Sequence, residues 1–224
     1  DNFDNGCGKT IYNSPYSHFL SEMAVFENKL YVASGGLKEN GQNQFRADGF
    51  FTLVDGEWTR YSEGTVPYLK DNRVLFDYYR VAVRPSDGRI FVGTFTKGLV
   101  EFDGEESFVL YNEKEQNSTL SRATRDTNNI RVGGLAFDRD NNLWIANHIA
   151  ERPISVFKSD GTWKSFNPPG DKALLQTAVD ELGYKWFVVG EKGVMVFDDG
   201  GTIDDVSDDR YRYFTENNST LPSS

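Results

Sequence analysis

The sequence predicts an all-β protein, a β-propeller with four recognisable four-stranded blades. The first observation is a repeated layout: a short strand with an alanine, a polar turn, and a second strand with an aromatic residue. The layout occurs at SEMAVFENKLYVASGG (21–36), YRVAVRPSDGRIFVGTFTKG (79–98), GLAFDRDNNLWIAN (134–147) and QTAVDELGYKWFVVGEKG (176–193). The second observation is that LYV, IFV and LWI are apolar on both faces, which fits short sheets buried between neighbours. Repeated meanders of this kind stack as propeller blades.

The elements follow a first segment, 1–20, which we expect to be a connector that leans on a blade. The repeated alanines, Ala24, Ala82, Ala136 and Ala178, are 82 − 24 = 58, 136 − 82 = 54 and 178 − 136 = 42 residues apart. A third strand follows at FFTLVDG (50–56), LVEFDG (99–104), ISVFKSDG (154–161) and VMVFDDG (194–200). A fourth strand follows at EWTRYSE (57–63), SFVLYNE (107–113), TWKSFNP (162–167) and RYRYFTE (210–216). The propeller, 21–224, therefore has predicted blades at about 21–63, 79–113, 132–167 and 175–216.

The aromatic residues of the second strands occupy the same place in every blade. They are Tyr31, Phe91, Trp144 and Trp186. Such a set could stack on sugars, but its regular position favours packing between neighbouring blades. We therefore expect all four to lie in inter-blade cores.

The ring is predicted to be open. Four blades in 224 residues give 224/4 = 56 residues each, which also suits a closed four-bladed ring of the haemopexin kind. Such rings are tied shut by a disulfide between the first and last blades, and Cys7 is the only cysteine. We expect a partial arc of a larger ring, with self-association through the apolar faces that the end blades expose.

No metal or cofactor site is predicted, and no catalytic residue can be named. The run DRDNN (138–142) imitates the start of an EF-hand loop but lacks the Gly and the distal Glu of that loop. It is predicted to be a hairpin turn, because Asp and Asn cap their own backbone. The acid-rich run 198–210 is expected to be solvated, and cation binding there stays open. The two histidines, His18 and His148, show no metal-ligand spacing.

The charge of the chain limits its partners. With 24 basic and 34 acidic residues the net charge is −10, which disfavours nucleic acid and adsorption to anionic membranes. No apolar run approaches 18 residues, so no membrane span is predicted.

The repeat carries a family resemblance. GLAFDRDNNLWIAN with VGTFTKGLVEFDG resembles the two-component-regulator propeller repeat of bacterial surface and sensor proteins. The chain is more closely similar to the N-terminal propeller of PorZ-type proteins of the type IX secretion system. The motifs that carry this likeness are YNSPY (12–16), LYVASGG (30–36), NSTL (117–120), GTWKSF (161–166), YKWFVV (184–189) and DDRYRYF (208–214). The resemblance implies a secreted, surface-exposed, non-enzymatic protein that helps deliver anionic lipopolysaccharide to the sortase of that system.

Two function classes stay open, with a third as a check. The first is a binding or scaffold module on the outer membrane exterior, with an anionic glycan, lipopolysaccharide or surface secretion proteins as partners. The alternative is the glycan-sensing periplasmic ectodomain of a hybrid two-component sensor. A glycosidase or lyase is the third class, but no convergent acid pair can be named, so the chain is not expected to be an enzyme.

A ligand is expected on the face formed by the links between blades and the loops between second and third strands. Aligning the blades on their alanines places Glu22, Arg80, Gly134 and Gln176 at matching entries near the axis. Five residues of this face are predicted ligand contacts: Tyr79, Arg80, Arg131, His148 and Arg152. The three arginines suit an anionic glycan, because a guanidinium fork pairs with phosphate and carboxylate. Replacing Arg80 and Arg131 together is expected to weaken binding without lowering the melting temperature.

Overall fold

Four antiparallel sheets of four strands each make up the described part of the chain. The computed structural model describes residues 13–71, 75–114 and 116–222. In every sheet the strands lie side by side in chain order, with the first strand at one edge and the fourth at the other. The predicted all-β fold with four four-stranded blades is confirmed.

The bounds of the strands follow the repeat. The first blade contains β1 (Leu20–Phe26), β2 (Lys29–Ser34), β3 (Phe50–Val54) and β4 (Glu57–Tyr61). The second contains β5 (Tyr78–Val83), β6 (Ile90–Thr94), β7 (Leu99–Phe102) and β8 (Phe108–Tyr111). The third contains β9 (Val132–Phe137), β10 (Leu143–Asn147), β11 (Ile154–Phe157) and β12 (Trp163–Phe166). The fourth contains β13 (Leu174–Val179), β14 (Lys185–Val189), β15 (Gly193–Asp198) and β16 (Arg210–Phe214).

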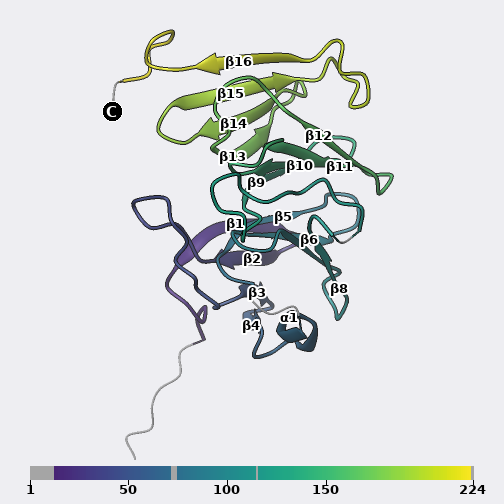
Figure 1. Ribbon diagram of the computed structural model, residues 1–224. Helices are drawn as coiled ribbons and strands as arrows, with labels where there is room; N and C mark the ends of the chain where they lie inside the picture. The colour runs from purple at the N-terminus through teal and green to yellow at the C-terminus, as the bar shows by residue number, and fades with distance from the viewer. Residues whose placement is uncertain (1–12, 72–74, 115, 223–224) are drawn as a thin grey trace, which may run out of the picture.

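The blades form an open arc. Figure 1 shows them following one another, with the first blade at the bottom of the view and the fourth at the top. The inner strands β1, β5, β9 and β13 each pack on the next. Within the described residues, no strand of the first blade packs closely on a strand of the fourth. The chain is therefore an arc of blades, as predicted.

Three apolar clusters hold the arc together, one between each pair of neighbouring blades. Each cluster contains one of the second-strand aromatics, Tyr31, Phe91 or Trp144, and all three are at most 5% exposed. The prediction of inter-blade packing is confirmed for these three.

The same prediction is wrong for Trp186. Its ring lies on the outer face of the fourth blade and stacks on Phe214 of the same blade, with ring centroids 6.2 Å apart. The physical reason is that no further blade in the described chain covers this face. The first blade likewise leaves Met23 and Val25 on its outer face, 65% and 73% exposed.

Helix α1 (Pro67–Asp71) links the first two blades and is not predicted from the sequence. Its Leu69 is fully buried in the first apolar cluster, and the hydroxyl of Tyr68 accepts a hydrogen bond from the backbone N–H of Leu110 at 2.9 Å. Pro67 stands at the first helical position, where proline is favoured, so a signal for this helix is present. This five-residue helix is far too short to span a bilayer.

The described part of the N-terminal segment, 13–19, lies against the first blade. The ring of Tyr16 is 6.1 Å from that of Phe51, and Ser17 Oγ donates a hydrogen bond to Asp48 Oδ2 at 2.8 Å. Cys7 and the first residue of YNSPY lie outside the described residues. The connector role of 1–20 therefore stays a prediction.

Candidate functional site

The connections divide the arc into two faces. The hairpin face carries the turns between first and second strands, at 27–28, 84–89, 138–142 and 180–184, and those between third and fourth strands. The loop face carries the loops between second and third strands and the links between blades.

The acidic turn 138–142 of the hairpin face stabilises the fold through hydrogen bonds within its own blade. The carboxylate of Asp138 accepts hydrogen bonds from the backbone N–H of Asn142 at 2.8 Å and from Trp144 Nε1 at 2.8 Å. Asp180 receives the same bond from Trp186 Nε1, also at 2.8 Å. Across residues 13–71, 75–114 and 116–222, no three His, Cys, Asp or Glu side chains gather as metal ligands would.

Four of the five predicted ligand contacts meet on the loop face around Phe95. The ring centroid of Phe95 is 5.0 Å from that of Tyr79 and 5.4 Å from that of His148. The guanidinium carbon of Arg131 lies 5.5 Å from the Phe95 centroid, and that of Arg80 lies 4.1 Å from the Tyr79 centroid. These five residues are named the Phe95 cluster.

Arg80 is the most constrained member of the Phe95 cluster. Its Nε donates a hydrogen bond to the carbonyl oxygen of Gly133 at 2.6 Å, and its NH1 lies 3.7 Å from Glu22 Oε1. The side chain is buried and joins three blades through these contacts. Burial raises the pKa of Glu22, although Arg80 and the N–H of Val81 oppose this effect. We therefore now expect replacement of Arg80, alone or together with Arg131, to lower the melting temperature, because its loss leaves buried polar groups unpaired.

Arg131 keeps unused hydrogen-bonding capacity. Its NH2 donates to Asp126 Oδ2 at 2.8 Å, while its Nε has no hydrogen-bond partner among the described residues. The side chain as a whole is 12% exposed, while Nε itself is buried. A buried donor without a partner is uncommon in proteins.

His148 belongs to the Phe95 cluster as a neutral ring. Burial, aided by the charge of Arg131, lowers its pKa from 6.5 to about 4, despite the hydrogen bond to Leu174. Its Nδ1 is 3.0 Å from the carbonyl oxygen of Leu174, so the neutral ring donates from Nδ1 and leaves Nε2 as an acceptor. His148 therefore adds no positive charge at neutral pH.

Arg152 lies apart from the Phe95 cluster. Its NH2 donates to the carbonyl oxygen of Ser165 on β12 at 3.3 Å. Phe95, in contrast, is central to the cluster but is not predicted as a site residue. The repeat does contain a signal for Phe95. Phe95 stands four residues after Phe91, and His148 stands four residues after Trp144, so Phe95 occupies the position in its blade that His148 occupies in the next.

The chain is similar to several solved structures. No protein-family model matches the chain, and no curated protein does. Among solved structures, it is similar to PorZ, described as an essential bacterial surface component of the type-IX secretion system of Porphyromonas gingivalis. The TM-score is 0.76 and the identity 26%, over 91% of this chain and 28% of that chain.

Two further structures are more distant. Virginiamycin B lyase from Staphylococcus aureus has a TM-score of 0.60 and 12% identity, over 87% of this chain and 55% of the lyase. The extracellular domain of a putative hybrid two-component system from B. thetaiotaomicron has a TM-score of 0.53 and 11% identity, over 85% of this chain and 21% of that chain. At these identities the likeness shows the β-propeller fold alone.

The predicted resemblance to PorZ and to two-component propellers is confirmed. The chain spans little more than a quarter of PorZ, with 28% of that chain covered. The activity and partners of a whole protein are therefore matters for proposal.

Proposed function

We propose that the chain is a non-enzymatic binding or scaffold propeller of a bacterial surface complex, and that its loop face binds an anionic glycan of the lipopolysaccharide class. The similarity to PorZ, a bacterial surface component of the type-IX secretion system, supports the setting on the cell surface. Surface secretion proteins are the further partners that this setting implies.

The Phe95 cluster is the observation that carries the proposal. Arg131, whose side chain is 12% exposed, and the partly exposed ring of Tyr79, on which Arg80 stacks, surround the fully buried ring of Phe95. Guanidinium groups pair with phosphate or carboxylate, while an aromatic ring such as that of Tyr79 packs against the apolar face of a sugar. An anionic sugar meets both needs at once.

The proposal gives His148 no catalytic role. A general base works best with a pKa near the working pH, whereas burial lowers the pKa of His148 to about 4 and its Nδ1 is hydrogen-bonded to the carbonyl oxygen of Leu174. Incubation with a glycan panel is expected to release no reducing sugar, and sustained release would contradict the non-enzymatic assignment.

The test is a calorimetric titration with lipopolysaccharide that carries a phosphorylated O-chain, and with the same material after dephosphorylation. Arg131→Gln is expected to weaken binding of the phosphorylated form by about tenfold, the size of one charge-assisted hydrogen bond. The matched control is Arg139→Gln, which removes the same charge from the hairpin face and should leave binding unchanged. Equal loss in both variants would overturn the site. Equal affinity for a neutral oligosaccharide would instead favour the glycan-sensing ectodomain.

A further inference from the structure

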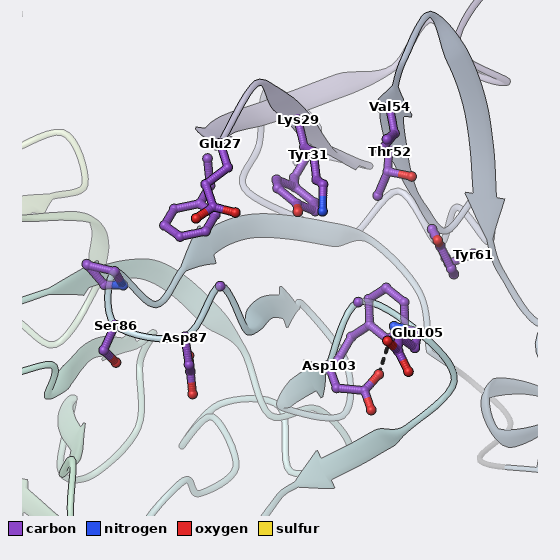
Figure 2. Close-up of a pocket in the computed structure, with 15 residues that line it drawn as sticks. Glu27, Lys29, Tyr31, Thr52, Val54, Tyr61, Ser86, Asp87, Asp103 and Glu105 are labelled. Atoms are coloured by element: carbon purple, nitrogen blue, oxygen red, sulfur yellow. Dashed lines mark hydrogen bonds between the residues drawn. The ribbon is translucent and has the colours of Figure 1, made fainter.

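The cavities of the two faces differ in charge. A cavity of about 510 Å³ opens on the hairpin face between the first and second blades, and Figure 2 shows the carboxylates of Glu27, Asp87, Asp103 and Glu105 around it. Lys29 is the one basic residue among the described residues that line it. Such a lining disfavours an anionic sugar, so the contacts for a glycan are to be sought on the loop face.

A smaller pocket of about 150 Å³ on the loop face has the reverse charge. Its described lining contains three basic residues, Lys97, Lys114 and Arg122, against one acid, Glu113. Glu113 is already engaged, because its Oε1 lies 2.5 Å from Arg122 NH2. Lys97 Nζ lies 3.5 Å from the carbonyl oxygen of Asn128 and has no ion-pair partner within the described residues. We name this pocket, lined by Lys97, Lys114 and Arg122, the basic pocket.

The basic pocket adjoins the Phe95 cluster through the loop between β6 and β7. Thr96 and Lys97, which line the pocket, directly follow Phe95 in the chain. The carbonyl oxygen of Thr96 accepts the N–H of Ile130 at 2.8 Å, and Lys97 pairs with Ile130 in a parallel bridge. Arg131 of the Phe95 cluster directly follows Ile130. The basic pocket and the Phe95 cluster are therefore neighbouring parts of one surface.

From the first blade, the loop between β2 and β3 reaches the same place. It covers 35–49, whereas the matching loops of the other blades cover only 95–98, 148–153 and 190–192. Asn43 Nδ2 donates a hydrogen bond to the carbonyl oxygen of Phe95 at 2.7 Å. The carboxylate of the fully buried Asp77 accepts the N–H groups of Phe45 at 2.9 Å and Arg46 at 3.0 Å. The long loop is thus fixed to the second blade beside the Phe95 cluster.

Phe45 is an exposed aromatic residue that this loop holds in place. The residue is 56% exposed, and its φ of 58° lies in the left-handed region, which is uncommon for a bulky side chain. The hydrogen bonds to Asp77 maintain this conformation. The ring of Phe45 meets that of Phe76 in a T-shaped arrangement, with centroids 6.1 Å apart. Phe45 is therefore positioned in advance to pack on the apolar face of a sugar ring.

Thr96 connects Phe45 with the basic pocket across the second blade. Its Oγ1 accepts the N–H of Phe76, on which Phe45 packs, at 3.0 Å, and its backbone is bonded to Ile130 of the pocket. The exposed aromatic ring and the basic pocket thus flank the Phe95 cluster, one toward the first blade and the other toward the third. A ligand that touches all three places has to be extended.

We propose that the loop face binds an extended oligosaccharide of several sugar units, with one sugar ring on Phe45 and one anionic group in the basic pocket. This assignment rests on the proposed function, since the Phe95 cluster holds the middle of the same oligosaccharide. The ligand is then a chain with spaced negative charges, and a single charged sugar fills only part of the surface.

The experiment is a calorimetric titration of the whole chain with fragments of a phosphorylated O-chain that contain one, three or six sugar units, and with the same fragments after dephosphorylation. The affinity is expected to rise at least about tenfold from one phosphorylated unit to six, because linked contacts reinforce one another. Equal affinity for all lengths overturns the extended site, and Arg131→Gln, if it still weakens binding, then leaves the proposed function in place. No binding of any fragment overturns both.

Phe45→Ala tests the aromatic contact. It is expected to weaken binding of the six-unit fragment about fivefold, with or without phosphate, and to leave the one-unit fragment unchanged. Phe45→Tyr keeps the ring and should keep the native affinity. The matched control is Tyr16→Ala, which removes a ring of similar exposure, 59%, from the N-terminal segment beside Phe51. Equal weakening by the two alanine variants would refute the contact.

Lys97→Met with Arg122→Met tests the basic pocket. The pair is expected to weaken binding of the phosphorylated six-unit fragment about tenfold and to leave the dephosphorylated one unchanged, because the lost contact is charge-assisted. The matched control is Lys29→Met with Arg139→Met, which removes the same charge from the hairpin face. Equal weakening by both pairs reports only the net charge of the chain and rules out the basic pocket as a contact.

Discussion

Arg80 shows how one residue of the loop face serves the fold as well as the surface. Its guanidinium connects the inner strands of three blades, through Glu22 of the first and the Gly133 carbonyl of the third. Glu22 in turn accepts the backbone N–H of Val81 at 2.8 Å. A change at Arg80 therefore disturbs the places where successive blades meet.

Replacing Arg80 with Met is expected to lower the free energy of unfolding by about 2 kcal/mol, because a buried carbonyl and a buried carboxylate lose their partner. Arg152→Met serves as the control and should change it by less than about 0.5 kcal/mol, as for an exposed residue. Urea unfolding followed by tryptophan fluorescence measures both. Equal stability of the Arg80 variant and the native chain would refute the role of Arg80 as a bridge.

His148 makes the stability of the fold depend on pH. Its pKa is lowered to about 4 in the folded state from 6.5. A depressed pKa means that the unfolded chain binds the proton more tightly, so stability is full above pH 6.5 and falls as the pH drops toward 4. We expect this residue to remove about 2 kcal/mol between pH 7 and pH 5.

Two carboxyl groups act in the opposite direction. Burial raises the pKa of Glu22 and of Asp77, so each favours the folded state as the pH falls. The effect of His148 is therefore measured as a difference, by comparing the native chain with His148→Gln over the same pH range. A variant that keeps the full loss between pH 7 and pH 5 would contradict the assignment.

At the scale of elements, the second strands give a matched pair of tryptophans. Trp144 and Trp186 make the same bond to an aspartate, but a further blade covers only Trp144. Trp144→Ala is expected to cost about 3–5 kcal/mol of stability, as for a large buried aromatic. Trp186→Ala should cost about 1 kcal/mol, since the ring is partly exposed on a face that no further described blade covers. Thermal unfolding of both variants checks the contrast, and equal costs would refute it.

The sequence predicts these elements well because the four repeats can be aligned with one another on the residues that they share. Alanines, turns and second-strand aromatics recur, so the strands and three inter-blade contacts follow from the pattern. Trp186 is mispredicted because a repeat pattern does not reveal where the last covered blade lies. Helix α1 has only a proline to mark it, since five residues show no period.

The candidate site is predictable only in part. Matching positions near the axis place Arg80, Arg131 and His148 on one face, and the structure brings them together with Tyr79. The separation of Arg152 depends on the course of its loop, which no local pattern sets.

At the scale of the whole molecule, both ends of the arc present apolar side chains. Met23 and Val25 mark one end, and Val188 beside Trp186 marks the other. We expect the chain to self-associate, since apolar faces of this kind are rarely left in water. Light scattering at several concentrations should show a mass that rises with concentration.

Met23→Lys with Val25→Lys is the variant that tests this expectation, because two charges on the first blade oppose burial of that face. It should shift the mass toward the monomer, while Glu27→Lys, on the neighbouring turn, should shift it much less. A native chain that stays monomeric at every concentration would contradict the expectation.

The strand order within the sheets has a consequence for how the chain acquires its structure. Within the described residues, each blade uses strands that are consecutive in the chain, and none borrows a strand from the far end. All pairing partners of a blade have therefore been synthesised before the next blade begins. Local connectivity of this kind favours rapid folding and growth of structure from neighbour to neighbour. The arc is suited to vectorial folding, with each finished blade serving as the template against which the next one condenses.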